Sequence, residues 1–547
     1  MATVASPTTP ESETVDVPDR RGQWRPLAAG AFTVLAILLV WFALIFPDQL
    51  GRFPPSTWIR LPVEGLLLVA VGLVLPPAAR RVVAMAFGLA LGLLAILKII
   101  NLGFFTVLGQ PFNPVTDASY LTSAVGVLRD SVGPGKTVAA VVATILFLAA
   151  VLVVLTRSAI RLTRSTAEHR APAALTVCVL AVVWLLCAAL GVRVAGAPVA
   201  ATAADAFTRE EADPALAVED AFAATPGADL LTGLRGKDVL LVFVESYGRA
   251  AVEHPVVSPE VKALLTRGTD SLRAAGFSSR SAFLTSSTYA GVSWLAHGTL
   301  QSGLWIDSQR RYNQLLQTDR LTLSAAFQRA GWRTVAAVPS NTEDWPEGQS
   351  FYQFDTMYDS RNVGYAGPKF GYASMPDQYT LSALHRHELA QPDHSPVMAE
   401  IDLVSSHGPW VPLPPLVDWE AVGDGSVFSG LPDPGPSADE VLGDPDLSKA
   451  VYREAIQYSL STLISFVETY GDDDLVVIAV GDHQPAKSVS GENASRDVPI
   501  TIIAHDPEVL DRIVSWGWQP GMLPNPDAPV WPMDAFRDRF LTAYGPG

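Results

Sequence analysis

The sequence predicts an N-terminal bundle of five transmembrane α-helices followed by a C-terminal α/β domain, and three observations carry this prediction. Five apolar segments lie within the first 193 residues, each close to the roughly 20 residues that span a bilayer. From residue 237 onward, β-rich apolar runs alternate with helical patterns, as in an α/β sheet covered by helices. Polar residues able to do chemistry directly follow several of these runs.

The membrane domain is expected over residues 27–193, behind a polar cytoplasmic tail at 1–26. The second span is the shortest and carries Glu64 near one end. No small-residue cleavage site followed by a soluble domain comes after the first span, so we interpret it as an anchor and not a removed signal peptide. The spans are expected at 27–46, 61–77, 82–104, 137–156 and 172–192.

Arginines flank alternate spans, and they predict the orientation of the chain. By the positive-inside rule the N-terminus lies in the cytoplasm and everything after residue 193 lies outside the plasma membrane. The odd number of spans makes this assignment consistent, and loss of one span would reverse it. The flanking arginines are Arg20, Arg21, Arg25, Arg80, Arg81, Arg157, Arg161, Arg164 and Arg170.

Two connecting segments join these parts. The loop 105–135 is expected outside the membrane, where Ala118–Val132 forms either an amphipathic helix on the bilayer or an ordinary surface loop. Residues 194–236 are rich in Ala, Pro, Thr and acidic residues and predict a linker, with a short helix at 207–222.

Charge and cysteine usage exclude several classes of protein. Residues 1–200 hold 15 Lys and Arg against 9 Asp and Glu, whereas the remainder holds 23 against 46. Nucleic-acid-binding proteins usually carry a basic patch, so the acidic character of residues 201–547 argues against nucleic acid as a partner. Both cysteines, Cys178 and Cys187, lie in the last apolar segment, so no disulfide framework and no Cys-rich zinc site is expected.

The domain at 237–547 is expected to gather its active residues at the carboxyl ends of its strands. Between two of these strands, the Pro-, Gly- and Asp-rich segment 408–446 predicts either a loop that covers the site or a disordered insertion. Strands are expected at Asp238–Val244, Thr334–Pro339, Val397–Val404, Leu475–Val480 and Pro499–Ala504, and helices at 258–276, 320–331 and 447–470.

Three residues at predicted strand ends have the chemistry of metal ligands. Asp482 and His483 follow one strand and offer an oxygen and an imidazole nitrogen, which suit zinc or manganese. Gly481 before them allows close backbone approach. Glu245 ends another strand, where a carboxylate is costly unless it is paired or bound to a cation. The alternatives are a polar pair in a turn, and a Glu245–Arg249 ion pair.

Ser293 is the candidate nucleophile, in Gly-Val-Ser-Trp-Leu-Ala-His. A helix is expected to begin near it, and a helix N-terminus favours an anion such as phosphate. A serine hydroxyl beside a divalent metal is a competent nucleophile near neutral pH. The alternatives are a simple N-cap serine, or one of Ser286, Ser287 and Thr288 as the true nucleophile.

His407 also follows a strand, and it could donate to a substrate oxygen or protonate a leaving group; a purely structural histidine is the alternative. Weaker candidates for substrate binding are Asp377 and Lys487. Trp345 and Trp410 could line a lipid or sugar head-group pocket, but both could equally be core residues.

Over residues 237–515 these motifs resemble the alkaline-phosphatase superfamily, in its sulfatase-like membrane branch of lipoteichoic acid synthases and lipid A phosphoethanolamine transferases. The resemblance implies an alkaline-phosphatase-like sheet between helices. It also implies Glu245, Asp482 and His483 as metal ligands, Ser293 as nucleophile and fourth ligand, and His407 as the substrate-contacting histidine.

The chain departs from this pattern in three places. Leu295 and His297 stand where sulfatases have the Pro and Arg needed for formylglycine, which argues against sulfate-ester hydrolysis. Phosphotransferases of the branch usually use threonine where Ser293 stands. Glu245-Ser246 replaces the Asp-Asp pair of two-metal members, so one divalent metal is expected, manganese or zinc, with magnesium as a third candidate.

The resulting hypothesis is an enzyme that transfers a phosphate-bearing head group, of phosphoglycerol or phosphoethanolamine type, through a seryl intermediate. Its donor would be a membrane phospholipid and its acceptor a glycan or lipid of the cell envelope. The alternatives are a membrane-anchored hydrolase of sulfuric esters or phosphodiesters, and a non-catalytic envelope scaffold. The sequence does not identify protein partners.

Overall fold

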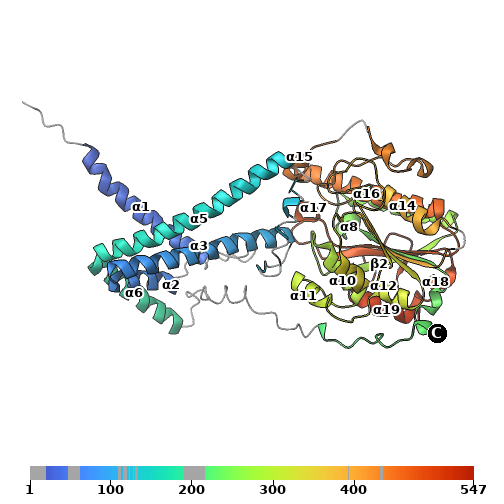
Figure 1. The fold of residues 1–547 in the computed structure, drawn as a ribbon, viewed down its shortest axis with the longest axis horizontal. Coiled ribbons are helices and arrows are strands. Elements are labelled where there is room, and N and C mark those ends of the chain that lie inside the picture. Colours follow the sequence, from blue (N-terminus) through green and yellow to red (C-terminus); the bar gives the residue numbers. More distant parts are fainter. Residues whose placement is uncertain are drawn as a thin grey trace, which may run out of the picture. The chain divides into compact units, whose positions relative to one another are not determined.

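The computed structural model describes residues 20–46, 62–108, 112–114, 117, 120–121, 124–126, 128–129, 133–189, 216–391, 394–430 and 435–546. The chain divides into two compact units. Unit 1 comprises residues 1–102 and 143–205, and unit 2 comprises residues 103–142 and 206–547. Figure 1 shows the helices of unit 1 and the mixed sheet with its covering helices in unit 2.

Unit 1 is built from five helices at the five predicted spans: α1 (Arg20–Ile45), α2 (Val63–Val74), α3 (Pro77–Leu108), α5 (Pro134–Glu168) and α6 (Arg170–Ala189). Three helices among the described residues are long and apolar enough to cross a membrane, at Pro77–Phe105, Pro134–Glu168 and Arg170–Cys187. Gly30–Ile45 and Val63–Val74 are apolar but shorter. The five-helix count therefore agrees with the prediction, while five complete spans remain an expectation.

Small residues bring α3 and α5 into close contact. A Cβ atom on Gly88 would lie 2.5 Å from Thr156 Cα, and one on Gly92 would lie 2.8 Å from a methyl carbon of Leu152. Glycines four residues apart on one helix face allow such backbone approach, which membrane helices use because packing and not water drives their association. Lys98 of α3 donates to Leu44 O at 3.2 Å, at the C-terminal end of α1, where a cation satisfies free carbonyls.

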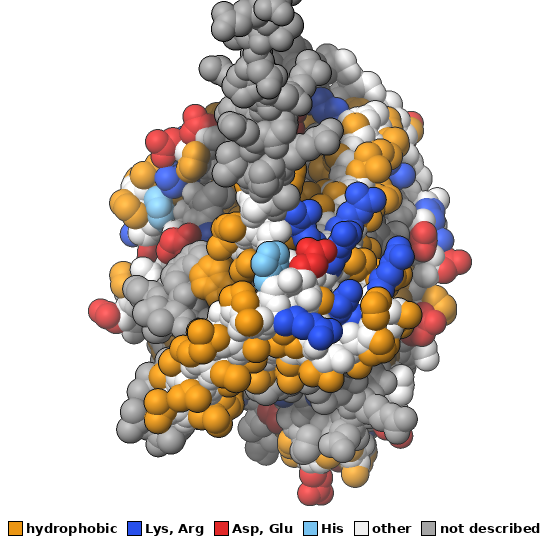
Figure 2. All heavy atoms as spheres, turned by 90° about the vertical axis from the view of Figure 1, so that its left-hand side faces the viewer, with side chains coloured by type: hydrophobic (Ala, Val, Ile, Leu, Met, Phe, Trp, Pro, Cys, Tyr) orange, Lys and Arg blue, Asp and Glu red, His pale blue; other side chains and the backbone are white. Residues whose placement is uncertain are grey.

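Among the described side chains of unit 1, Arg80 and Arg81 lie in the first turn of α3, and Arg164 and Arg170 lie on either side of the turn between α5 and α6. Arg80 lies close enough to Glu168 for the two side chains to interact electrostatically, so both turns lie at one end of the unit. Figure 2 shows Lys and Arg side chains gathered beside hydrophobic ones. This arrangement is the one that the positive-inside rule requires, and the side on which the end lies remains a prediction.

Unit 2 contains one nine-stranded sheet in the order β4-β3-β5-β1-β6-β7-β2-β8, with β9 also paired to β2. The first five strands in this order run parallel, whereas β7 is antiparallel to both β6 and β2. The strands are β1 (Asp238–Val244), β2 (Ser278–Thr285), β3 (Arg333–Val338), β4 (Thr356–Asp359), β5 (Val397–Leu403), β6 (Leu475–Gly481), β7 (Asp497–Ala504), β8 (Gln519–Pro520) and β9 (Val530–Pro532).

Helices cover both faces of the sheet, as the resemblance implied. Leu240, Val242 and Val244 of β1 pack on the side of α9 and α16, whereas Val239 and Leu241 pack on the side of α10, α12 and α19. This alternation is the period-two pattern of a strand buried on both faces. The helices are α8 (Ala250–Glu253), α9 (Ser258–Ala274), α10 (Ser293–Ser302), α11 (Gln309–Leu315), α12 (Leu323–Arg329), α13 (Pro346–Tyr352), α14 (Asp377–Leu384), α15 (Ala438–Gly443), α16 (Pro445–Tyr470), α17 (Lys487–Ser490), α18 (Pro507–Asp511) and α19 (Ala535–Ala543).

The described part of the expected linker, residues 216–236, packs onto the domain. Leu231 and Leu234 are fully buried. Asp220 accepts two hydrogen bonds of 2.9 Å from the guanidinium of Arg537 on α19. The Arg537 side chain is 0% exposed, and it pairs both with Asp220, which precedes the sheet, and with Asp538 at 2.6 Å. The short helix expected at 207–222 lies mostly outside the described residues, as does about half of the helix expected at Ala118–Val132.

Residues 408–446 pack as ordered turns in their described part and do not form a cover over the candidate site. Phe428 is buried and stacks edge-on against Phe370 at 6.3 Å. Val417 N donates to Gln378 on α14 at 3.1 Å. None of the described residues of this segment lines the cavity described below. The expectation of a covering loop is therefore wrong for this conformation, since the segment's apolar side chains are used in packing against α14.

Candidate active site

Glu245 and Asp482 meet because β1 and β6 are adjacent parallel strands. Val244 pairs with Gly481 at the last position of the ladder, so the next residue of each strand emerges at the same edge of the sheet. A Cβ atom on Gly481 would lie 1.9 Å from Tyr247 O, which explains the glycine there. Ser246 adopts a φ of 57°, rare for a residue with a side chain, and its N–H donates to Asp482 Oδ1 at 2.7 Å.

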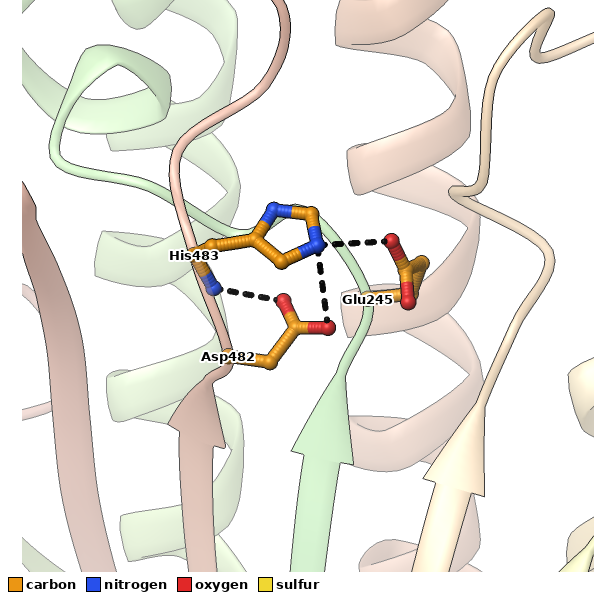
Figure 3. A group of neighbouring side chains, drawn as sticks. All are labelled: Glu245, Asp482 and His483. Atoms are coloured by element: carbon orange, nitrogen blue, oxygen red, sulfur yellow. Dashed lines mark hydrogen bonds and ion pairs between the residues drawn. The ribbon is translucent and has the colours of Figure 1, made fainter. Parts of the chain in front are cut away.

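Glu245, Asp482 and His483 form a buried cluster, the first triad (Figure 3). His483 Nε2 lies 3.4 Å from Glu245 Oε1 and 3.6 Å from Asp482 Oδ2. His483 Nδ1 lies 2.9 Å from the carbonyl oxygen of Gln484. A carbonyl can only accept, so Nδ1 carries the proton and Nε2 presents its lone pair to the two carboxylates.

The first triad fits a divalent metal ion. Asp482 Oδ2 is buried and has no hydrogen-bond partner among the described residues, although an unpaired buried carboxylate oxygen is costly. Burial and the neighbouring Glu245 carboxylate raise the pKa of Asp482 to about 7. Burial would also raise the pKa of Glu245, but positive charge on the neighbouring imidazoles of His483 and His407 lowers it below its usual value. A cation would resolve this repulsion, and the nitrogen and oxygen donors suit zinc or manganese.

Ser293 completes the cluster. Its hydroxyl donates to Glu245 Oε2 at 2.9 Å and lies 3.2 Å from His483 Nε2. It is the first residue of α10, and Val292 occupies the N-cap position with φ 59°, an outlier for a β-branched residue. Ala290 before it also has φ 59°. Backbone strain of this kind is found at functional sites, so the simple N-cap interpretation of Ser293 does not hold.

The other candidate hydroxyls have structural partners. Ser286 Oγ donates to Asp482 O at 2.5 Å, and the Thr288 hydroxyl oxygen lies 3.5 Å from Ser286 Oγ. Ser287 Oγ accepts a hydrogen bond of 2.8 Å from Thr299. Arg249, the alternative partner of Glu245, pairs with Glu253 and Asp497 at 2.8 and 3.1 Å.

His407 faces the same cavity as Ser293. Its ring stacks on Tyr372 at 3.7 Å between centroids, and its Nδ1 lies 2.7 Å from Gly408 O. Nδ1 therefore carries the proton, and Nε2 is the nitrogen available to a substrate. Burial lowers the pKa of His407, so the ring is neutral at neutral pH and its Nε2 is a hydrogen-bond acceptor.

The cavity has a volume of about 240 Å³, and its described lining contains neither Lys nor Arg. It includes Trp345, as predicted from the sequence, together with Trp294. Tyr120 from the loop 105–135 packs against Trp294 at 5.5 Å between ring centroids. The further lining side chains include Ser340, Asn341, Tyr312, Tyr352 and Tyr372.

Two predicted substrate-binding residues lie away from this cavity. The Asp377 carboxylate accepts hydrogen bonds from Ser405 N at 2.9 Å and from Ser459 Oγ at 2.5 Å, which ties α14 to α16 and to the loop before His407. Lys487 is 40% exposed and pairs with Glu492 at 3.6 Å. Trp410, the third aromatic candidate, is buried and packs edge-on against Tyr452.

The structure adds a second cluster that the sequence analysis missed, formed by His297, Glu400 and Asp402 and called here the second triad. Glu400 and Asp402 lie two residues apart on β5, so both face α10. His297 follows Ser293 by one turn of α10. The signal was present in the sequence, because two carboxylates at alternate positions of an otherwise apolar strand share one face. The run was interpreted only as a buried strand.

No protein-family profile and no curated protein sequence matches the chain. Its fold is similar to that of lipoteichoic acid synthase LtaP from Listeria monocytogenes, at 15% identity and a TM-score of 0.36, over 50% of this chain and 66% of that one. The periplasmic domain of EptC from Escherichia coli matches at 12% identity and a TM-score of 0.37, over 56% of this chain and 82% of that one.

A third solved structure, from Vibrio parahaemolyticus, is described as a protein in the alkaline phosphatase superfamily. It matches at 16% identity and a TM-score of 0.36, over 55% of this chain and 70% of that one.

Proposed function

We propose that this protein is a metal-dependent transferase that moves a phosphate-bearing head group from a membrane phospholipid to an acceptor of the cell envelope. The observation that carries the proposal is the position of Ser293 Oγ, 2.9 Å from Glu245 and 3.2 Å from His483 Nε2. A nucleophile within reach of a candidate metal site is the arrangement that phosphoryl transfer needs. The apolar helices of unit 1 favour a lipid donor, because they would hold the site near a membrane surface.

The first triad and Ser293 would hold the metal, which when bound supplies positive charge beside the serine oxygen and the phosphoryl oxygens. Glu245 orients the Ser293 hydroxyl through its hydrogen bond. In the first step the Ser293 oxygen forms a bond to phosphorus and the bond from phosphorus to the lipid oxygen breaks. The serine proton is transferred, and the lipid leaves with a hydroxyl.

In the second step an acceptor hydroxyl attacks the phosphoseryl group, and the serine regains its proton. His407 suits the proton transfers of both steps, because its Nε2 faces the cavity and can take a proton from one oxygen and return it to another. We further propose that the site lies on the extracytoplasmic side of the membrane. The transferred head group is then of phosphoglycerol or phosphoethanolamine type.

The test uses the full chain in detergent, supplied with manganese or zinc and with head-group-labelled phosphatidylglycerol or phosphatidylethanolamine. Peptide mass spectrometry should find a glycerophosphate or phosphoethanolamine adduct on Ser293, absent from Ser293→Ala. Ser287→Ala is the matched control, because that buried serine lies near the same helix and should leave the adduct in place.

Two other outcomes would change the proposal. Metal-dependent cleavage of a generic phosphate or sulfate ester, with no transfer to any acceptor, would make the protein a hydrolase. Absence of turnover and of bound metal would make the domain a scaffold.

A further inference from the structure

We propose that the second triad, His297, Glu400 and Asp402, is a second binding site for a divalent cation. The sequence resemblance predicts one metal, held by the first triad. The second site would therefore be an addition in this chain, placed in the same cavity as Ser293. Its metal content can be measured without substrate, so the inference stands or fails independently of the proposed transferase activity.

The two triads have the same composition and the same spacing. Each combines one imidazole, one Glu and one Asp. In the second triad His297 Nδ1 lies 3.4 Å from Glu400 Oε1 and 3.6 Å from Asp402 Oδ1. In the first triad the corresponding distances are also 3.4 and 3.6 Å.

These separations suit ligands around an ion better than direct hydrogen bonds. Nitrogen–oxygen hydrogen bonds in proteins are about 2.7–3.2 Å long, shorter than both distances. Ligand atoms placed tetrahedrally at about 2.1 Å from a zinc ion lie about 3.4 Å from one another. The second triad therefore leaves the space that a small cation needs.

Asp402 provides an independent observation. Its Oδ1 is buried and has no hydrogen-bond partner among the described residues, as is true of Asp482 Oδ2 in the first triad. Unpaired buried carboxylate oxygens are costly, and both of these belong to triads with an imidazole nitrogen nearby. The two orphan oxygens therefore mark equivalent positions in two similar sites.

Neighbouring contacts hold the second triad in place. Gln301 Nε2 donates to Glu400 Oε2, and the Gln301 oxygen accepts from Ser324 N at 2.9 Å. The His297 ring stacks on Phe243 at 3.7 Å between centroids. Two of the three donor side chains are thus fixed before any ion arrives, which is the preorganisation that a metal site requires.

The charge of the cavity supports a second cation. Four carboxylates face it, those of Glu245, Asp482, Glu400 and Asp402, and its described lining has neither Lys nor Arg. One divalent ion leaves two negative charges from these carboxylates. A phosphodiester substrate would bring another negative charge. A second divalent ion balances the four carboxylates.

The imidazole donor favours manganese or zinc over magnesium, so these two ions are the probes. The full chain in detergent is treated with chelator to remove bound metal and is then dialysed against Mn²⁺ or Zn²⁺. Its metal content is measured by inductively coupled plasma mass spectrometry. We expect two ions per chain in the native protein, one in Asp402→Asn and one in Asp482→Asn. Asp527→Asn, an exposed aspartate, is the matched control and should keep two.

One ion per chain in the native protein, unchanged in Asp402→Asn, would overturn the inference. His297 would then be an imidazolium paired with two carboxylates. Two ions in both the native protein and Asp402→Asn would also overturn it, because the second ion would lie elsewhere. If Asp402→Asn does not fold, His297→Gln replaces it, and the native count of one or two ions still decides.

Discussion

Ser293 and His407 divide the proposed chemistry between a nucleophile and a proton carrier. Ser293 touches the first triad directly. His407 lines the same cavity just beyond the end of β5 and belongs to neither triad. Substitutions at the two positions should therefore differ in their effect on metal binding.

Substitution of His407 by Gln should lower turnover by about 10²- to 10⁴-fold, the usual range for loss of a general acid–base group. Metal content should stay at the native value, because His407 is outside both triads. Head-group transfer and metal content measured on the same preparation test this. His385→Gln is the control, since that ring stacks on Tyr470 at 3.9 Å away from the cavity. A loss of metal in His407→Gln would contradict the assignment.

Substitution of Asp377 by Asn should change how stability depends on pH. Burial raises the pKa of Asp377 to about 6, above its usual value near 3.8. The folded state therefore binds more protons than the unfolded state between about pH 4 and pH 6, and this residue's contribution to stability falls as pH rises through that window. The loss is on the order of 3 kcal/mol.

An Asn side chain does not titrate and can still accept from Ser405 N, so the Asp377→Asn variant should lack this part of the pH dependence. Thermal unfolding of both proteins at pH 4, 5, 6 and 7 measures it. Parallel curves for the two proteins would show that Asp377 does not titrate in this range.

At the scale of elements, the site depends on how closely β1 and β6 approach at their carboxyl ends. Gly481 is the last residue of β6 and has no space for a Cβ atom beside Tyr247 O. The strained residues Ser246 and Val292 lie on the turns that leave β1 and enter α10. The backbone at the ends of β1 and β6 and at the start of α10 therefore determines where Ser293 and the side chains of the first triad lie.

Gly481→Ala should destabilise the domain by about 3 kcal/mol, because the added methyl group must displace the backbone of Tyr247 in the turn that follows β1. It should also weaken metal binding, since Glu245 and Asp482 would separate. Chemical denaturation and a metal titration test both effects. Gly443→Ala is the control, because a Cβ atom there meets nothing within 4 Å. An unchanged metal affinity in Gly481→Ala would show that metal binding does not depend on the close approach at Gly481.

At the scale of the whole molecule, bound metal should be part of the stability of unit 2. The first triad brings two carboxylates together in a buried place, so a cation that binds only the folded state adds stability, about 2.7 kcal/mol at a hundredfold excess over its dissociation constant. Chelator should lower the melting temperature of the native protein. In Asp482→Asn the effect of chelator should shrink, whereas an equal effect in both proteins would place the stabilising ion elsewhere.

The sequence predicted most of the parallel sheet and the first triad, because both depend on local patterns. β1 and β6 are almost entirely apolar runs, and the polar residues of the first triad follow their ends directly in sequence. β2 was missed because its first residues, Ser-Ser-Arg-Ser, are polar and partly exposed, so its strand character arises from pairing with β7. The second triad was missed because its residues lie inside α10 and β5 and not at strand ends, and only the packing of α10 on β5 brings His297 to the two carboxylates.

The pairing of Asp220 with Arg537 has a practical consequence for anyone who prepares the sheet domain of unit 2 alone. The fragment boundary suggested by the first strand, near residue 237, would remove the only carboxylate that bonds to both terminal nitrogens of Arg537 in the described structure. It would leave a fully enclosed guanidinium with Asp538 as its remaining carboxylate partner among the described residues. The two hydrogen bonds to Asp220 would be lost, and bonds between charged groups are worth about 1.5–3 kcal/mol each. A soluble fragment should therefore begin upstream of Asp220, and one that begins at residue 237 should aggregate or melt at a lower temperature.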